Sequence, residues 1–326
     1  MYKNMPGRPV LESSRLGFGC VQLTTHRKQA EAIATLECAF AMGITHFDVA
    51  RVYGFGRAEG ILAKFLRGKR QQVTVATKFG FQPPSGLAGN ARLINTVKRA
   101  LGPFPGLLKR AKQRGSAMVQ SRVFDPEAAM LSLETSLREL GTDYVDVLLL
   151  HEATLADAAS EELLNALQQQ IAKGTVRHIG MASEFRNYRG DAKVLPQAYE
   201  VVQFNDNARS RNLVALAGRD ERFLITHSIF EPAGLLMDIV KKHPDIASEA
   251  SSRMNADVND PEVINSLLLH YALRSNARGI VLFSSTNARH IEANAKAAES
   301  RPYSEVQLEG FVEFVDRALG AVQSPG

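Results

Sequence analysis

Four residues whose side chains can take part in proton transfer lie at the ends of strand-like runs. Asp48 and Tyr53 occur in THFDVARVYG, Lys78 closes VTVATK, and His151 closes VDVLLLH. An apolar run followed directly by a polar residue is typical of parallel barrels, in which the active site lies where the carboxyl ends of the strands meet. The pattern therefore predicts an enzyme whose active site lies at one end of a barrel.

The residue types Tyr, Lys and Asp explain one another in such a site. A Tyr hydroxyl has a pKa of about 10, so it is a weak acid near neutral pH unless a cation lies close to it. Lys78 could supply that cation, and a buried ammonium keeps its proton only when a carboxylate such as Asp48 balances it. Taken singly, each residue could instead be a turn, packing or surface residue. As a group they indicate a functional site more strongly than any one of them does alone.

Eight strand-like segments alternate with helical patterns along the chain. Such alternation predicts a parallel sheet, and eight repeats predict a closed (β/α)8 TIM barrel. Apolar residues recur with helical spacing between Asp125-Pro126 and Gly141, and again between Ser160 and Gly174. The strand candidates begin near residues 16, 45, 73, 145, 176, 201, 223 and 279.

Length and composition favour one soluble enzyme domain spanning residues 1–326. A chain of 326 residues with 45% hydrophobic content can bury one large core, and no linker-like stretch divides it. The two cysteines, Cys20 and Cys38, form neither a disulfide framework nor a paired metal motif, and the histidines have no ligand spacing. No apolar run reaches the roughly 20 residues that cross a bilayer, and a signal-peptide core is absent. We expect a cytoplasmic protein with no metal, membrane span or nucleic-acid partner.

The motifs around these residues resemble the aldo-keto reductase family. FDVARVYG, from Phe47 to Gly54, is similar to the family's acid and tyrosine signature, and the ATK ending at Lys78 and the LLLH ending at His151 resemble its next two blocks. The resemblance covers nearly the whole chain. It implies a TIM barrel whose first residues, before Leu16, form a short hairpin.

The resemblance also implies a reaction and a role for each member of the tetrad. The expected enzyme reduces an aldehyde or ketone, or oxidises the matching alcohol or sugar, by hydride transfer with NADP(H). Tyr53 would protonate the developing alkoxide, Lys78 paired with Asp48 would lower the pKa of Tyr53, and His151 would orient the carbonyl oxygen. A catalytically weak subunit that senses nicotinamide nucleotide and binds a protein partner stays open as the alternative, although the complete tetrad argues against it.

Positions expected to contact the cofactor follow from the same resemblance, less completely than the tetrad. Gln203 takes the place of the glutamine that binds the nicotinamide carboxamide. His227 stands where an aromatic ring normally stacks, although it could equally be a core histidine whose hydrogen bonds are satisfied. Arg289 could supply the cation for the adenosine phosphate from one position away, so NADP(H) is favoured and NAD(H) stays possible. A capped helix with a solvated Arg289 is the simpler alternative. The full set is Gly19, Cys20, Asp48, Ser183, Gln203, His227, Ser228, Ser284, Ser285, Arg289 and Asn294.

A basic insertion follows the third strand, over residues 81–125. It holds eight of the chain's lysines and arginines and no acid before Asp125, and subtracting those eight from the net charge of +5 leaves −3 for the remainder. Since it leaves the catalytic end, it could form a cationic lid over the pocket, although a solvated loop or a membrane or partner contact explains it as well. Phe55 and Phe79 could line an apolar slot for a small carbonyl or alcohol substrate, or pack in the core.

Overall fold

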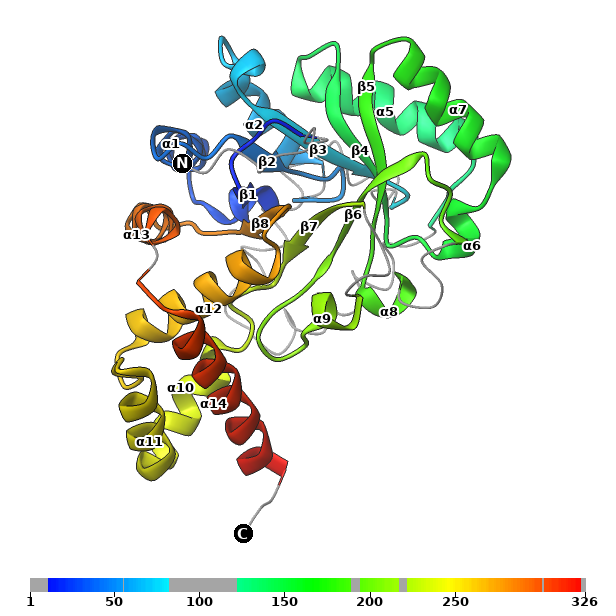
Figure 1. The fold of residues 1–326 in the computed structure, drawn as a ribbon. Coiled ribbons are helices and arrows are strands. Elements are labelled where there is room, and N and C mark those ends of the chain that lie inside the picture. Colours follow the sequence, from blue (N-terminus) through cyan, green and yellow to red (C-terminus); the bar gives the residue numbers. More distant parts are fainter. Residues whose placement is uncertain are drawn as a thin grey trace, which may run out of the picture.

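The computed structural model contains a closed barrel of eight parallel strands (Figure 1), which confirms the predicted (β/α)8 TIM barrel. The structure describes residues 11–54, 56–81, 122–188, 194–216, 222–300 and 302–323. Each strand pairs in parallel with the next one along the chain, and the last pairs with the first. The strands are β1 (Leu16–Gly19), β2 (His46–Asp48), β3 (Thr74–Phe79), β4 (Val145–His151), β5 (Val176–Ala182), β6 (Tyr199–Asn205), β7 (Phe223–His227) and β8 (Ile280–Phe283).

Helices follow the strands and surround the barrel, as Figure 1 shows. Those of the first half are η1 (Cys20–Thr25), α1 (Gln29–Ala41), α2 (Arg57–Leu66), η2 (Arg70–Gln72), α5 (Pro126–Leu140), α6 (Leu155–Ala158), α7 (Glu161–Ala172) and α8 (Phe185–Tyr188). The second half has α9 (Asn212–Leu216), α10 (Ala233–Lys242), α11 (Pro244–Met254), α12 (Pro261–Ser275), α13 (Ala288–Glu299) and α14 (Glu305–Gln323).

Local sequence signals set the ends of the two helices that the spacing predicted. Asp125 accepts a hydrogen bond from the Ala128 N–H at 2.7 Å, and Pro126 occupies the first turn of α5. Gly141 ends α5 in the left-handed region, with φ of 63°. Ser160 caps α7 in the same way by accepting from the Leu163 N–H at 3.3 Å. Both predicted helices are thereby confirmed.

Two layers of apolar side chains hold the barrel, one inside it and one between strands and helices. The interior cluster is small and comes from residues pointing inward on several strands, with Leu11 among them. The larger cluster joins the outward faces of the strands to the surrounding helices. Strands buried on both faces are expected for a parallel sheet covered by helices. A separate cluster joins α10, α11, α12 and α14, which extend beyond the barrel in Figure 1.

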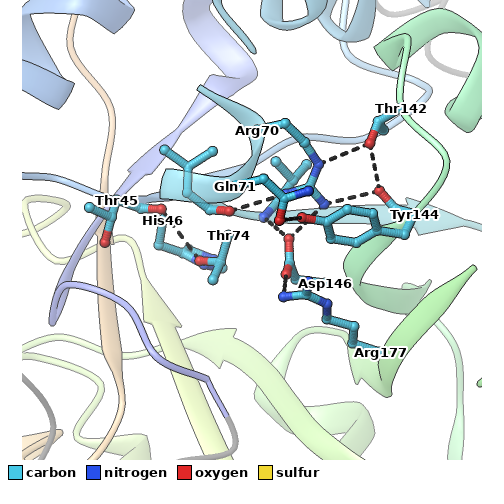
Figure 2. A network of polar contacts seen from close by, with 11 residues as sticks. Thr45, His46, Arg70, Gln71, Thr74, Thr142, Tyr144, Asp146 and Arg177 are labelled. Atoms are coloured by element: carbon cyan, nitrogen blue, oxygen red, sulfur yellow. Dashed lines mark hydrogen bonds and ion pairs between the residues drawn. The ribbon is translucent and has the colours of Figure 1, made fainter. Parts of the chain in front are cut away.

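A network of charged side chains lies at the amino ends of β3, β4 and β5 (Figure 2). Asp146 accepts hydrogen bonds from Arg70 at 2.7 Å, from Arg177 at 2.8 Å and from the Val75 N–H at 2.9 Å. The Tyr144 ring lies 3.8 Å from the Arg70 guanidinium and 4.3 Å from that of Arg177. Because this network lies at the end of the barrel opposite the strands' carboxyl ends, we assign it to stability.

The two ends of the basic insertion meet in an antiparallel bridge between Phe81 and Arg122. Residues 82–121, and with them the proposed lid, lie outside the described residues. The expected amino-terminal hairpin falls largely on residues 1–10, which lie outside them as well. Over the described ranges, no helix is long and apolar enough to cross a membrane.

Candidate active site

The barrel brings all four residues of the predicted tetrad into one cavity. Asp48 and His151 are the last residues of β2 and β4, Lys78 is the last but one of β3, and Tyr53 lies in the loop after β2. These strands are neighbours in the barrel, so their carboxyl ends meet. The cavity that the four side chains line has a volume of about 470 Å³.

Lys78 and Asp48 form a buried ion pair at the bottom of this cavity. Lys78 Nζ lies 2.5 Å from Asp48 Oδ1 and also donates to the Val49 carbonyl oxygen at 3.1 Å. Both residues are 3% exposed. Burial alone would lower the pKa of Lys78, but the Asp48 carboxylate and the Tyr53 oxygen favour the ammonium and raise the pKa above its usual value. Lys78 is therefore a cation near neutral pH.

The Tyr53 hydroxyl lies 3.5 Å from Lys78 Nζ. Burial raises the pKa of Tyr53, and the Lys78 ammonium lowers it by less than burial raises it. Lys78 thus acts on Tyr53 in the expected direction, but the net shift is upward because the phenolate would be poorly solvated. Tyr53 consequently holds its proton at neutral pH.

His151 is neutral in this environment. Burial, followed by the charge of Lys78 and then by His227, lowers the pKa of His151 to about 3. Its ring stands nearly perpendicular to that of Tyr53, at 82° with centroids 6.1 Å apart. Its Nδ1 is buried and has no hydrogen-bond partner among the described residues. A neutral imidazole beside the Tyr53 ring can orient an oxygen atom by a hydrogen bond and does not compete as the acid.

The part of the cavity beside Asp48 offers polar atoms that suit a nicotinamide carboxamide. Gln203 Nε2 donates to Asp48 Oδ2 at 3.1 Å, whereas Gln203 Oε1 is buried without a partner in the described part of the chain. An amide N–H of a bound group would satisfy that oxygen. Ser183 also lines the cavity, but its hydroxyl donates to the Ala153 carbonyl oxygen at 2.6 Å.

Most of the other predicted cofactor positions line this cavity or the groove that continues from it. Gly19, His227, Ser228 and Ser284 line the cavity. The groove has a volume of about 600 Å³, shares Ser284 and Phe230 with the cavity, and is also lined by Ser285 and Asn294. Burial lowers the pKa of His227 to about 4, so its ring is neutral and can stack on an aromatic group.

Three predicted positions lie apart from these two cavities. Cys20 is fully buried and its thiol contacts the Phe18 carbonyl oxygen at 3.8 Å. Arg289 is exposed in the first turn of α13, where its backbone N–H donates to the cap residue Asn287. Phe79 is buried against Phe124, with ring centroids 6.1 Å apart. Phe55 lies outside the described residues.

Several residues that line the cavity have no signal in the sequence motifs. Val21 and Gln22 reach it from η1, and Phe230 and Glu231 from the segment after β7. Glu152 has one sequence signal, its position directly after His151, and in the structure it adopts a left-handed backbone with φ of 58°. A non-glycine residue in that region is unusual and often marks a functional site. Within the described ranges, no group of His, Cys, Asp or Glu could hold a metal ion.

Known proteins include relatives of this chain over part of its length. The curated relatives include the 6-dehydroglucose reductase of Agrobacterium fabrum, 32% identical over 184 residues that cover 54% of this chain and 52% of the relative. A probable aldo-keto reductase of Glycine max is 29% identical over 181 residues, covering 54% of this chain and 43% of the relative. The chain thus matches about half the length of these curated relatives.

Solved structures show the same fold at low sequence identity. Aldo-keto reductase AKR11C1 from Bacillus halodurans is 20% identical with a TM-score of 0.71, and the alignment covers 96% of both chains. An aldo-keto reductase from Klebsiella pneumoniae, solved in complex with NADPH, is 20% identical with a TM-score of 0.64 and covers 97% of this chain and 95% of its own. The sequence model of the aldo/keto reductase family matches residues 15–316. The chain belongs to the aldo/keto reductase family.

Proposed function

We propose that the protein is an oxidoreductase that reduces an aldehyde or ketone with NADP(H), or oxidises the matching alcohol, with Tyr53 as the general acid. The observation that carries the proposal is the approach of the Tyr53 hydroxyl to within 3.5 Å of Lys78 Nζ in a cavity that His151 also lines. A sensing subunit would need the cofactor contacts but not a buried, cation-assisted proton donor.

The residues of the cavity divide the work of the reaction among them. A reduced nicotinamide, when bound, would supply the hydride for the carbonyl carbon. Tyr53 donates its proton to the oxygen as negative charge develops there, and Lys78 stabilises the resulting phenolate. Asp48 keeps Lys78 charged, since burial without a counter-charge would remove the proton from the ammonium. Neutral His151 holds the carbonyl oxygen in place by a hydrogen bond.

The cofactor would lie along the cavity and its continuing groove. Gln203 Oε1 is a buried acceptor with no partner among the described residues, and it could accept a hydrogen bond from the nicotinamide carboxamide. His227 offers a neutral ring face to the nicotinamide. The NADPH complex of the Klebsiella pneumoniae relative supports NADP(H). NAD(H) is the second candidate, because Asp260 and Glu262 line the groove and a carboxylate there would repel a 2′-phosphate and could bind a ribose hydroxyl.

A panel of carbonyl compounds tests the proposal. Consumption of NADPH should be measured with sugars, aromatic aldehydes and 2-oxo compounds, and both reduced cofactors should be titrated by fluorescence quenching. The proposal expects turnover with at least one compound class and tighter binding of NADPH than of NADH. Tight cofactor binding with no turnover across the panel would favour a sensing subunit, and a clear preference for NADH would overturn the cofactor assignment.

The cytoplasm is the compartment that we propose for this reaction. Cys20 and Cys38 are both free thiols, which suits a reducing environment.

A further inference from the structure

A second cavity lies outside the active site, between η1 and the amino-terminal ends of α1 and α2. It has a volume of about 540 Å³ and shares no lining residue with the catalytic cavity. Its lining carries the cations Arg27, Lys28, Arg51 and Arg57 against one acid, Glu139. A concave site with this charge excess attracts anions.

None of the four cations forms an ion pair within the described part of the chain. By contrast, the exposed residues Arg177, Arg253 and Arg317 each pair with a carboxylate. Arg51 and Arg57 are half-buried, and Arg57 Nε donates to the Gly54 carbonyl oxygen at 3.2 Å. Arg27 and Lys28 are exposed at the rim. Partly desolvated cations without an acid are unfavourable unless an anion joins them.

A buried acid near Arg51 offsets part of this charge. Glu59 is fully buried and accepts a hydrogen bond from the Thr77 hydroxyl at 2.7 Å. Burial raises the pKa of Glu59 while Arg51 lowers it. Glu59 does not line the cavity, and even with its full charge counted beside Glu139 the cations remain in excess.

Two helices present their amino-terminal ends at the cavity. α1 begins at Gln29 and α2 at Arg57, and both residues line the cavity. The N-cap of α2 is Gly56, which has φ of 85° and offers no side chain to its first N–H groups. The two helices lie side by side in Figure 1. The dipoles of both helices add to the attraction for an anion, although each first turn already holds one acid, Glu31 in α1 and Glu59 in α2.

We propose that this cavity binds a small molecule through a phosphate or diphosphate group. The guanidinium groups of Arg51 and Arg57 can each bind phosphate oxygens in a bidentate manner, and the helix ends can donate to the same oxygens. The volume is that of a pocket for one small ligand, which favours a phosphorylated small molecule over an acidic protein surface.

The site borders the segment that carries Tyr53. Arg51 and Arg57 lie on either side of it in the chain, and η1 contributes Val21 and Gln22 to the catalytic cavity but Leu23 and Thr24 to this one. At Gly54, which has φ of +58°, a Cβ atom would lie 2.2 Å from a methyl carbon of Thr24. A ligand bound by Arg51 and Arg57 would therefore contact the chain on both sides of Tyr53, the proposed acid.

Calorimetric titration of the full chain with inorganic pyrophosphate, at fixed ionic strength, tests the proposal. With the proposed cofactor site saturated by NADP⁺, wild type should bind one equivalent. Arg57→Gln should weaken binding about tenfold or more, as expected for the loss of a charge-assisted hydrogen bond to phosphate, and Arg51→Gln with Arg57→Gln should abolish it. Arg67→Gln is the matched control, because Arg67 is exposed at the other end of α2 and its removal changes the net charge equally. This control should bind like wild type.

A second variant removes charge from the cavity without risk to the fold, because the rim residues Arg27 and Lys28 are exposed. Arg27→Gln with Lys28→Gln should weaken binding by a smaller factor than Arg57→Gln. The proposal is wrong if wild type binds no pyrophosphate, if Arg67→Gln weakens binding as much as Arg57→Gln, or if an acidic peptide binds at this cavity and pyrophosphate does not.

Discussion

Replacing Asp48 by Asn removes the counter-charge of Lys78 and almost no volume. The two side chains are 4% and 2% exposed, and the ion pair is 2.5 Å long. Breaking a buried ion pair from one side costs about 3–5 kcal/mol, because the remaining charge is left without a partner. We expect Asp48→Asn to lose about that much free energy of unfolding, less whatever Lys78 recovers by giving up its proton.

An exposed pair of the same protein provides the comparison. Lys69 Nζ lies 3.0 Å from Glu37 Oε1, with side chains 28% and 44% exposed. Water screens such a pair, so Glu37→Gln should cost less than about 1 kcal/mol. The double variant Asp48→Asn with Lys78→Met removes both buried charges and should be more stable than Asp48→Asn alone, while carbonyl reduction stays lost.

Urea unfolding followed by circular dichroism measures these differences, and NADPH consumption measures activity on the same samples. The reasoning is refuted if Asp48→Asn is destabilised no more than Glu37→Gln. It is also refuted if the double variant regains activity, because the Tyr53 acid would then need no ammonium.

Three further predictions concern two shifted pKa values and the network around Asp146. Burial raises the pKa of Asp206 to about 6, so the stability that this group contributes is complete below about pH 4 and is lost as the pH rises through about 6. Between pH 4 and pH 7.5 the free energy of unfolding of wild type should fall by about 3 kcal/mol relative to that of Asp206→Asn, which has no carboxyl group to ionise. Urea unfolding of both proteins at the two pH values measures this, and a difference between them that does not change with pH contradicts the prediction. Asp146→Asn should cost about 3 kcal/mol of unfolding free energy, because Arg70 and Arg177 lose their shared partner. KM in steady-state assays should stay unchanged, and a raised KM would mean that the Asp146 network affects the active site. His151→Gln should lower kcat about a hundredfold without changing the shape of the pH profile between pH 5 and 8, because the pKa of His151 is about 3; a step near pH 6.5 in wild type alone contradicts this.

The sequence predicted the barrel well because its signals are local. The strands are largely apolar runs, and β2, β4, β6 and β7 end in a polar residue. Helix α5 carries its own start at Asp125 and its own stop at Gly141. The tetrad followed from those strand ends, since neighbouring parallel strands bring Asp48, Lys78 and His151 to one edge.

Features that depend on distant contacts were not predictable in this way. Phe79 packs against Phe124, a residue at the far end of the basic insertion, and does not line the cavity. The upward pKa shift of Tyr53 comes from burial, which no motif reports. The cluster of α10, α11, α12 and α14 also has no motif of its own.

The rate of carbonyl reduction by Tyr53→Phe, measured at saturating NADPH beside the affinity for NADPH, tests the central claim most directly. The substitution removes one hydroxyl that lies 3.5 Å from Lys78 Nζ and leaves the ring in place. We expect the rate to fall by about a hundredfold to ten-thousandfold, as for the loss of a general acid, with cofactor affinity nearly unchanged. A variant that reduces an accepted carbonyl at the wild-type rate would show that Tyr53 is not the proton donor.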